Sequence, residues 1–191
     1  SEPPVSKITY GDAGRTFIKS KLYLGSGASI ILEANDVTSG TDKTYVSINS
    51  SEYKEYTQPI PVNEQKEYTI KYYSVDNVGN AEEDNEISFM VDTESPVTSH
   101  AIEGDQEENV LSGRSKITLS ATDNSSGVRR TYYQIDDGKP RIYSGTIYMK
   151  YLSQGEHTLT YYSVDKVKNQ EEKKEYVFFL DKTPPIVVEE V

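Results

Sequence analysis

The sequence predicts an all-β chain made of two tandem β-sandwiches of about seven strands each, and three observations carry this prediction. The first is an internal repeat of about 90 residues, marked by the stretch YYSVD at residues 72–76 and again at residues 161–165. The second is that segments rich in β-branched and aromatic residues recur between polar turns, roughly ten residues apart. The third is that no stretch keeps a helical period long enough to form a helix.

The repeat predicts the domain organisation. Each copy is large enough for one hydrophobic core, so the 191 residues are expected to form a first repeat at residues 1–93 and a second at residues 94–182. Residues 183–191 (TPPIVVEEV) resemble the openings of both repeats, which contain EPPV and ESPV. We therefore expect this segment to be an exit linker or the start of a third repeat in a longer array.

Each repeat is expected to open with an edge strand, because the prolines there cannot donate a hydrogen bond to a ladder. The next strand, SIILEA in the first repeat and KITLSA in the second, places alternate apolar residues in the core. A polar loop then leads to KTYVSIN or RTYYQID. In the second repeat the turn DDGKP follows, and Gly138 is available there for a positive φ.

The YYSVD strand is predicted to cross the core of each sandwich. Its alternation places Tyr161 and Ser163 inside and Tyr162 on the solvent side, and the first repeat follows the same pattern. A last strand, ISFMVD or YVFFLD, closes each repeat. Strands at this spacing indicate a sandwich of the immunoglobulin or fibronectin type III kind. An antibody-type domain is disfavoured, because the chain has neither Cys nor Trp.

Composition argues against several function classes. The net charge of −11 argues against nucleic acid as a partner, because phosphate binding needs clustered cations. No run approaches the roughly 18 apolar residues of a membrane span, so we expect no membrane insertion by this chain. His100 and His157 are the only histidines, and no common catalytic motif is present. We therefore expect no enzymatic activity.

Outward tyrosines form a candidate binding surface. In a sandwich the third and sixth strands are neighbours, so each repeat should place two tyrosines side by side on its solvent face. Such a pair can anchor a partner protein, and adjacent arginines could attract an acidic one. The alternative is cross-strand packing that only stabilises the sheet. The candidate residues are Tyr45, Tyr73, Arg129, Arg130, Tyr132 and Tyr162.

A second candidate site is a structural calcium site built from loop and linker oxygens. In this fold the loops after the second and sixth strands lie at the pole where the chain enters the domain, and Ca²⁺ prefers such oxygen ligands. The alternative is that these side chains cap their own turns. The candidate ligands are Asp92, Glu94, Asp123, Asp165 and Asn169.

The strings ATDNSSGVRRTYYQIDDG and LSQGEHTLTYYSVDKVKNQE in the second repeat carry a family resemblance. They resemble the immunoglobulin-like repeat of many bacterial surface proteins, including the leptospiral outer-membrane adhesin family. The family has VGN or AGN after SVD, which the first repeat keeps at Val78–Asn80, whereas the second has Lys168 in place of the glycine.

The resemblance implies a non-catalytic role at a bacterial cell surface or outer membrane, or in a secreted protein. Some members of the family bind host extracellular-matrix or plasma proteins such as elastin, fibronectin, laminin and fibrinogen, which implies an adhesin with a part in virulence. Similar repeats also occur as spacers in large secreted enzymes. The alternative is therefore a passive spacer or stalk in a larger surface or secreted protein, including a carbohydrate-associated one.

Overall fold

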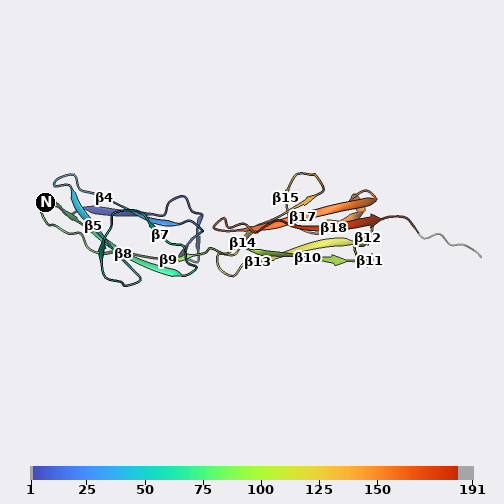
Figure 1. The fold of residues 1–191 in the computed structure, drawn as a ribbon, viewed down its shortest axis with the longest axis horizontal. Coiled ribbons are helices and arrows are strands. Elements are labelled where there is room, and N and C mark those ends of the chain that lie inside the picture. The colour runs from blue at the N-terminus through green and yellow to red at the C-terminus, as the bar shows by residue number, and fades with distance from the viewer. Residues whose placement is uncertain (1, 185–191) are drawn as a thin grey trace, which may run out of the picture. The chain divides into compact units, whose positions relative to one another are not determined.

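The computed structural model describes residues 2–184, and these form strands with a single short 3₁₀ turn (Figure 1). The described chain divides into two compact units. Unit 1 contains the chain up to Glu94 together with Lys166–Asn169, and unit 2 contains Ser95–Asp165 and the chain from Gln170. Each unit is a sandwich of two sheets, so the predicted all-β fold of two sandwiches is confirmed. Among residues 2–184, no helix is long and apolar enough to cross a membrane.

Unit 1 packs a three-stranded sheet, ordered β1-β4-β7, against a six-stranded sheet, ordered β2-β3-β9-β8-β5-β6. The first strand lies at a sheet edge, as its prolines predict. Neighbouring strands are antiparallel except β3 and β9, which pair in parallel. The strands are β1 (Val5–Thr9), β2 (Arg15–Ile18), β3 (Lys21–Leu24), β4 (Ser29–Asn35), β5 (Thr41–Ile48), β6 (Lys54–Glu55), β7 (Ile60–Pro61), β8 (Glu67–Asp76) and β9 (Asn85–Val91).

Unit 2 repeats this topology with sheets β10-β13-β16 and β11-β12-β18-β17-β14-β15. Its strands are β10 (Val97–Glu103), β11 (Gln106–Glu107), β12 (Val110–Ser112), β13 (Lys116–Thr122), β14 (Val128–Ile135), β15 (Arg141–Ile142), β16 (Ile147–Tyr148), β17 (Gly155–Asp165) and β18 (Lys174–Asp181), with the 3₁₀ turn η1 at Met149–Tyr151. Within the described residues each unit thus has nine strands rather than about seven, and the surplus comes from segments of two to four residues.

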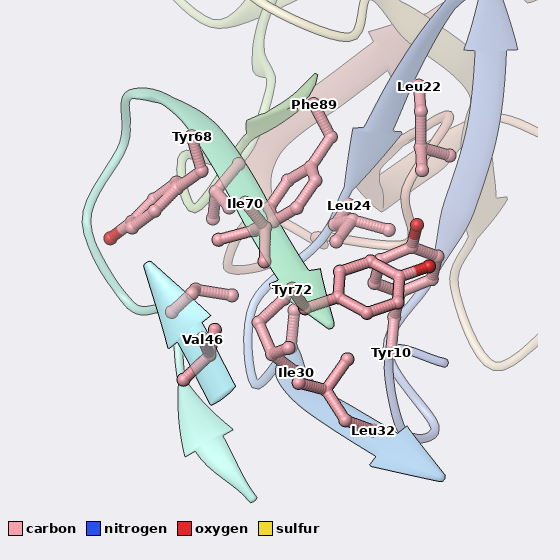
Figure 2. Close-up of a cluster of buried hydrophobic side chains, with 13 residues drawn as sticks. Tyr10, Leu22, Leu24, Ile30, Leu32, Val46, Tyr68, Ile70, Tyr72 and Phe89 are labelled. Atoms are coloured by element: carbon pink, nitrogen blue, oxygen red, sulfur yellow. The ribbon is translucent and has the colours of Figure 1, made fainter. Parts of the chain in front are cut away.

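The core of unit 1 lies between its two sheets, where 13 buried side chains meet (Figure 2). The central ones are Leu24, Ile30, Ile70 and Phe89, each with no exposed surface. They come from strands of both sheets and alternate with outward residues, as a two-residue period requires. This alternation confirms the predicted core face of the YYSVD strand.

The core of unit 2 has the same construction. Leu111, Ile117, Leu159 and Leu180 are completely buried, and Phe178 packs among them. Partly buried side chains of β14 and of the segment after β16 pack against this cluster. The edge of the core that faces β15 and β16 is therefore less tightly closed than its centre.

The serine of YYSVD joins the two sheets inside each unit. The Ser163 hydroxyl lies 2.6 Å from the Thr98 hydroxyl on β10 and 2.8 Å from that of Thr131 on β14. In unit 1 the Ser74 hydroxyl makes the same two contacts, at 2.6 Å with Ser6 and 2.7 Å with Thr44. These bonds satisfy polar groups that would be costly to bury alone.

Two turns differ from the sequence prediction or extend it. In DDGKP the residue with positive φ is Asp136 (φ 50°) and not Gly138. Position 138 favours glycine for a steric reason, because a Cβ there would lie 2.8 Å from the Ile135 carbonyl oxygen. After the YYSVD strand, Gly79 has φ 91° and Lys168 has φ 75°. The left-handed turn is thus kept in the second repeat although its glycine is not.

The predicted domain boundaries can be set beside these units, although residues 185–191 lie outside the described part of the chain. The N-terminal segment of unit 1 ends at Glu94, one residue beyond the expected first repeat, and unit 1 also includes Lys166–Asn169. The expected third segment at residues 183–191 falls almost entirely outside the described residues, so it stays a prediction.

Candidate functional site

The predicted tyrosine pair of unit 2 lies on the outer face of its larger sheet. Tyr132 on β14 and Tyr162 on β17 occupy directly opposed positions in the antiparallel ladder. Their rings stack with centroids 5.2 Å apart and an interplanar angle of 18°. Both side chains remain half-exposed. The stack contributes about 0.5–1.5 kcal/mol beyond simple burial and leaves a flat aromatic surface in contact with water.

Neighbouring strands extend this pair into a row across the sheet. Ile142 on β15 lies opposite Tyr132 and is 50% exposed. On the other side, the Lys173 ammonium lies 5.7 Å from the centroid of the Tyr162 ring, in cation–π distance. The outer row of unit 2 is therefore apolar at one end, aromatic in the middle and cationic at the other.

The two arginines lie at the start of β14, where a β-bulge shifts the register between Val128 and Arg130. Arg130 is paired with Val164 and lies on the same face as Tyr132, two residues further along. Arg129 is the extra residue of the bulge. Both side chains are exposed, and the ion pairs found among residues 2–184 use neither of them.

Unit 1 has the same stack, and a third tyrosine packs against it. Tyr45 and Tyr73 are opposed in the ladder, with ring centroids 5.1 Å apart and an interplanar angle of 24°. The ring of Tyr53 packs edge-on against Tyr73 at 5.1 Å. The Tyr53 hydroxyl donates a 2.7 Å hydrogen bond to Asp84, and burial together with this bond raises the pKa of Tyr53 to about 12.

Charged pairs flank the stack of unit 1. Lys43 pairs with Glu55 at 3.3 Å and Lys71 pairs with Glu86 at 3.1 Å. Glu55 lies opposite Tyr45, in the position that Ile142 holds in unit 2. Equivalent positions on the two outer faces thus differ in chemistry. Those of unit 1 hold carboxylates and ion pairs, whereas those of unit 2 hold the exposed Ile142 and cations that take part in none of the ion pairs found among residues 2–184.

Both histidines have structural partners. His157, only 7% exposed, contacts the Asp136 carboxylate through Nδ1 at 2.8 Å and the Ser153 carbonyl through Nε2 at 3.0 Å. Burial alone would lower the pKa of His157, but these two acceptors outweigh burial and raise it. His100 lies against Tyr161 and Tyr176, and burial lowers the pKa of His100.

Three of the five predicted calcium ligands belong to unit 1, namely Asp92, Glu94 and Asn169. The Asn169 side-chain amide donates to the backbone carbonyls of Asp92 at 2.8 Å and Glu94 at 3.1 Å. The Asp92 carboxylate is fully buried and accepts the Glu94 backbone N–H at 3.3 Å. The structure therefore brings Asp92, Glu94 and Asn169 together, with Asn169 acting as a donor in these contacts.

The other two predicted ligands belong to unit 2 and also lie close together. A carboxylate oxygen of Asp123 and one of Asp165 are within 4.8 Å of each other. Asp123 also caps its own loop, accepting the N–H groups of Ser125 at 3.1 Å and Gly127 at 2.6 Å. Asp36 does the same in unit 1, where it accepts the N–H groups of residues 38–40. Turn capping thus accounts for the contacts of Asp123.

Two carboxylates with a clear structural role were missed by the sequence analysis. Glu171 accepts the backbone N–H groups of Thr98 at 3.0 Å and Ser163 at 2.7 Å, together with the Thr98 hydroxyl, and pairs with Lys174 at 3.0 Å. Glu82 accepts the N–H groups of Ser6 and Ser74 in unit 1. A signal was present, because a glutamate follows two residues after the turn asparagine in both VGNAEE and VKNQEE.

No protein-family model and no curated protein sequence match this chain. Solved structures do resemble it. The fibronectin(III)-like modules of Clostridium thermocellum CbhA align over 93% of this chain and 95% of theirs, with a TM-score of 0.52 and 13% sequence identity. The D00–D0 domain of intimin aligns over 91% of this chain and 99% of its own, with a TM-score of 0.33 and 12% identity. At such identities the likeness to the CbhA modules concerns the fold alone, which is the fibronectin type III kind of sandwich.

Proposed function

We propose that this chain is a non-catalytic pair of repeats from a bacterial cell-surface protein, an adhesin that binds host extracellular-matrix or plasma proteins. The observation that carries the proposal is the outer row of unit 2, where Ile142, Tyr132, Tyr162 and Lys173 lie on four neighbouring strands or at their ends. Aromatic side chains on a rigid sheet lose little conformational entropy on binding, and they are common anchors of protein interfaces.

Charge supports a protein partner with an acidic surface. Lys173 lies against the stack and Arg130 lies on the same face, next to Arg129, so cations gather beside the stack on a chain whose net charge is −11. Such a face favours partners that offer carboxylates near an apolar patch. Binding should then weaken as ionic strength rises, because exposed charges are screened over about 10 Å in 0.1 M salt.

Surface exposure, a bacterial outer membrane and host binding rest on the resemblance to the leptospiral adhesin repeats. Sandwich domains of the immunoglobulin and fibronectin type III kinds are generally non-catalytic, and both histidines here are engaged in packing and hydrogen bonds. These points support a binding role over an enzymatic one.

A passive spacer is the second candidate, and unit 1 favours it. Its tyrosine stack is contacted edge-on by Tyr53 and bordered by the ion pairs Lys43–Glu55 and Lys71–Glu86. Such contacts are expected where cross-strand packing only stabilises the sheet. On this alternative the repeats carry other domains of a larger surface or secreted protein, which includes carbohydrate-associated proteins.

A binding scan separates the two candidates. The whole chain would be passed over immobilised fibronectin, laminin, elastin, fibrinogen and a glycan array, at low and at high salt. Salt-sensitive binding to at least one of the proteins is expected for an adhesin. A flat response to all of them would favour the spacer.

A further inference from the structure

Unit 2 contains a pocket of about 270 Å³ that opens between the edge strands of its two sheets. One wall comes from β14 and β15, and the other from β16 and the 3₁₀ turn η1 that follows it. β15 is the last strand of the larger sheet and β16 is the last strand of the smaller one. The opening therefore lies at an edge of the sandwich, and the outward tyrosine pair takes no part in lining it.

The inner part of the pocket is apolar. Tyr133 and Ile135 of β14 and Leu152 after η1 pack against the hydrophobic core from this side, and Ile147 of β16 is almost fully buried. The Tyr133 ring is held edge-on against Tyr143, with centroids 6.3 Å apart. A preformed apolar recess of this kind takes an apolar group from a ligand.

The mouth of the pocket is cationic. Lys139 and Arg141 line it, and the ion pairs of unit 2 within residues 2–184 use other cations. A third cation, Lys150, holds its ammonium 5.2 Å from the ring centroid of Tyr148 and 4.9 Å from that of Tyr151. Tyr151 is 76% exposed, so this arrangement lies at the rim.

Two carboxylates precede these cations along the chain, in the turn after β14. Asp136 is engaged by His157 and by the Thr158 backbone N–H. Asp137 is exposed on the same turn. The rim therefore has an excess of positive charge, because three cations lie beside one carboxylate that has no such structural partners among the described residues.

Unit 1 keeps only part of this chemistry at the equivalent positions. The register of β7 and β16 against β4 and β13 aligns Ile60 with Ile147. On that alignment, unit 1 has Glu52, Pro61 and Glu64 where unit 2 has Lys139, Tyr148 and Tyr151, but it keeps a cation, Lys54, in place of Arg141. The two rim tyrosines and the cation Lys139 are thus particular to unit 2.

The lining also indicates the class of ligand. Its side chains include no carboxylate and no carboxamide, which are the groups that would satisfy the many hydroxyls of a sugar. An apolar body that carries a carboxylate fits better. Because β15 is an edge strand, its outer side can also accept the backbone of an extended peptide as an additional strand.

We propose that unit 2 binds an extended acidic peptide segment of a partner protein, with one apolar side chain in this pocket and neighbouring carboxylates on Lys139 and Arg141. This site goes beyond the proposed tyrosine surface and does not depend on it. A free aromatic acid shares the same chemistry, so the test must separate the two sources.

The test is an NMR titration of the whole isotope-labelled chain with four probes. These are the capped peptide Gly-Asp-Phe-Glu-Gly, the same peptide with both acids replaced by lysine, the same peptide with glycine in place of phenylalanine, and free 3-phenylpropionate. The acidic phenylalanine peptide is expected to shift the amides of β15, β16 and η1 and to bind at least tenfold more tightly than the other three.

The matched variant is supplied by the first repeat. Lys139→Glu combined with Tyr151→Glu copies Glu52 and Glu64, alters two exposed side chains, and should weaken the acidic peptide at least tenfold while leaving the thermal midpoint unchanged. Binding that is unchanged in this variant, or absent at millimolar peptide, would overturn the proposal. Equally tight binding of 3-phenylpropionate would assign the pocket to free acids, and pocket shifts that grow with protein concentration alone would assign it to a second copy of the chain.

Discussion

At the scale of single residues, Glu171 shows how a buried carboxylate can fasten an edge strand. It is 6% exposed and accepts backbone N–H groups from β10 and β17, and so joins the two sheets of unit 2. Burial would raise the pKa of this carboxyl, but hydrogen bonds from Thr98 and Ser163 and the pairing with Lys174 outweigh burial and lower it.

The substitution Glu171→Ala is expected to lower the free energy of unfolding of unit 2 by about 2–3 kcal/mol at pH 7, because it leaves two buried N–H groups without acceptors. Since the folded pKa lies below the ordinary value of about 4.3, the ionised carboxylate stabilises the fold above that value and the contribution is lost as pH falls through the folded pKa. Amide hydrogen exchange of β17 in the whole chain measures this.

The difference between wild type and variant should therefore shrink on moving from neutral pH to about pH 3. Glu82→Ala is the matched control, because it should speed amide exchange in unit 1 and leave β17 unaffected. A difference in β17 that is equally large at both pH values would show that the charge of Glu171 does not contribute.

At the scale of elements, the turn after the YYSVD strand is fixed by its aspartate. Asp76 accepts the N–H groups of Val78 at 3.0 Å and Asn80 at 2.8 Å, and it also accepts bonds from the Asn80 and Ser39 side chains. Burial opposes ionisation of Asp76, yet these donors hold its pKa well below the usual range. These bonds therefore hold the turn of unit 1 around its left-handed residue Gly79, and Lys168 has a left-handed conformation at the equivalent position of unit 2.

Exchanging the two left-handed residues should change stability in opposite directions. Gly79→Ala is expected to cost roughly 1–2 kcal/mol, because the position has φ 91° and a Cβ would meet no neighbour, so only the backbone conformation is penalised. Lys168→Gly should gain less than about 1 kcal/mol, since glycine removes that cost but loses more entropy on folding. Differential scanning calorimetry would record the two shifts, and a Gly79→Ala midpoint equal to wild type would refute the conformational reading.

The strands also show which features of the fold can be predicted from sequence patterns. Alternation in YYSVD predicted the inward and outward residues of β8 and β17, because the pleat fixes side-chain direction. The short strands β2, β3, β11 and β12 were not predicted, since two to four residues give too little alternation and the parallel pairing of β3 with β9 is set by the fold. The pocket could not be predicted from the sequence for the same reason, because the two-residue strands β15 and β16 line its opening.

At the scale of the whole molecule, two copies of one fold carry different surfaces. The core positions and the hydroxyl network are shared, whereas the outer face gains cations in unit 2 and ion pairs in unit 1. The sequence predicted the tyrosine pairs correctly as neighbours. It did not predict that Tyr53 packs against one pair, because this contact comes from the loop between β5 and β6.

The acidic loops give a prediction for the whole chain. Because Asp123 and Asp36 already cap their own loops, we expect the thermal midpoints in millimolar Ca²⁺ and in chelator to agree. An ion bound only by the folded chain must raise the midpoint. A thermal midpoint that rises when Ca²⁺ is added, and that no longer rises in Asp123→Asn, would show that Asp123 does more than cap its turn. It would assign Asp123 and Asp165 to a calcium site.

The central claim is that the outer tyrosine row of unit 2 is a protein-binding surface. It is tested most directly by comparing two double variants, Tyr132→Ala with Tyr162→Ala in unit 2 and Tyr45→Ala with Tyr73→Ala in unit 1, in surface plasmon resonance against the matrix protein that binds wild type best. The unit 2 variant is expected to lose at least tenfold in affinity, about 1.4 kcal/mol or more, and the unit 1 variant to bind as wild type does. Lys173→Asp, which copies Asp84 of unit 1, should weaken binding and reduce its salt dependence. Unchanged binding by a unit 2 variant that retains its circular dichroism and cooperative unfolding would contradict the account.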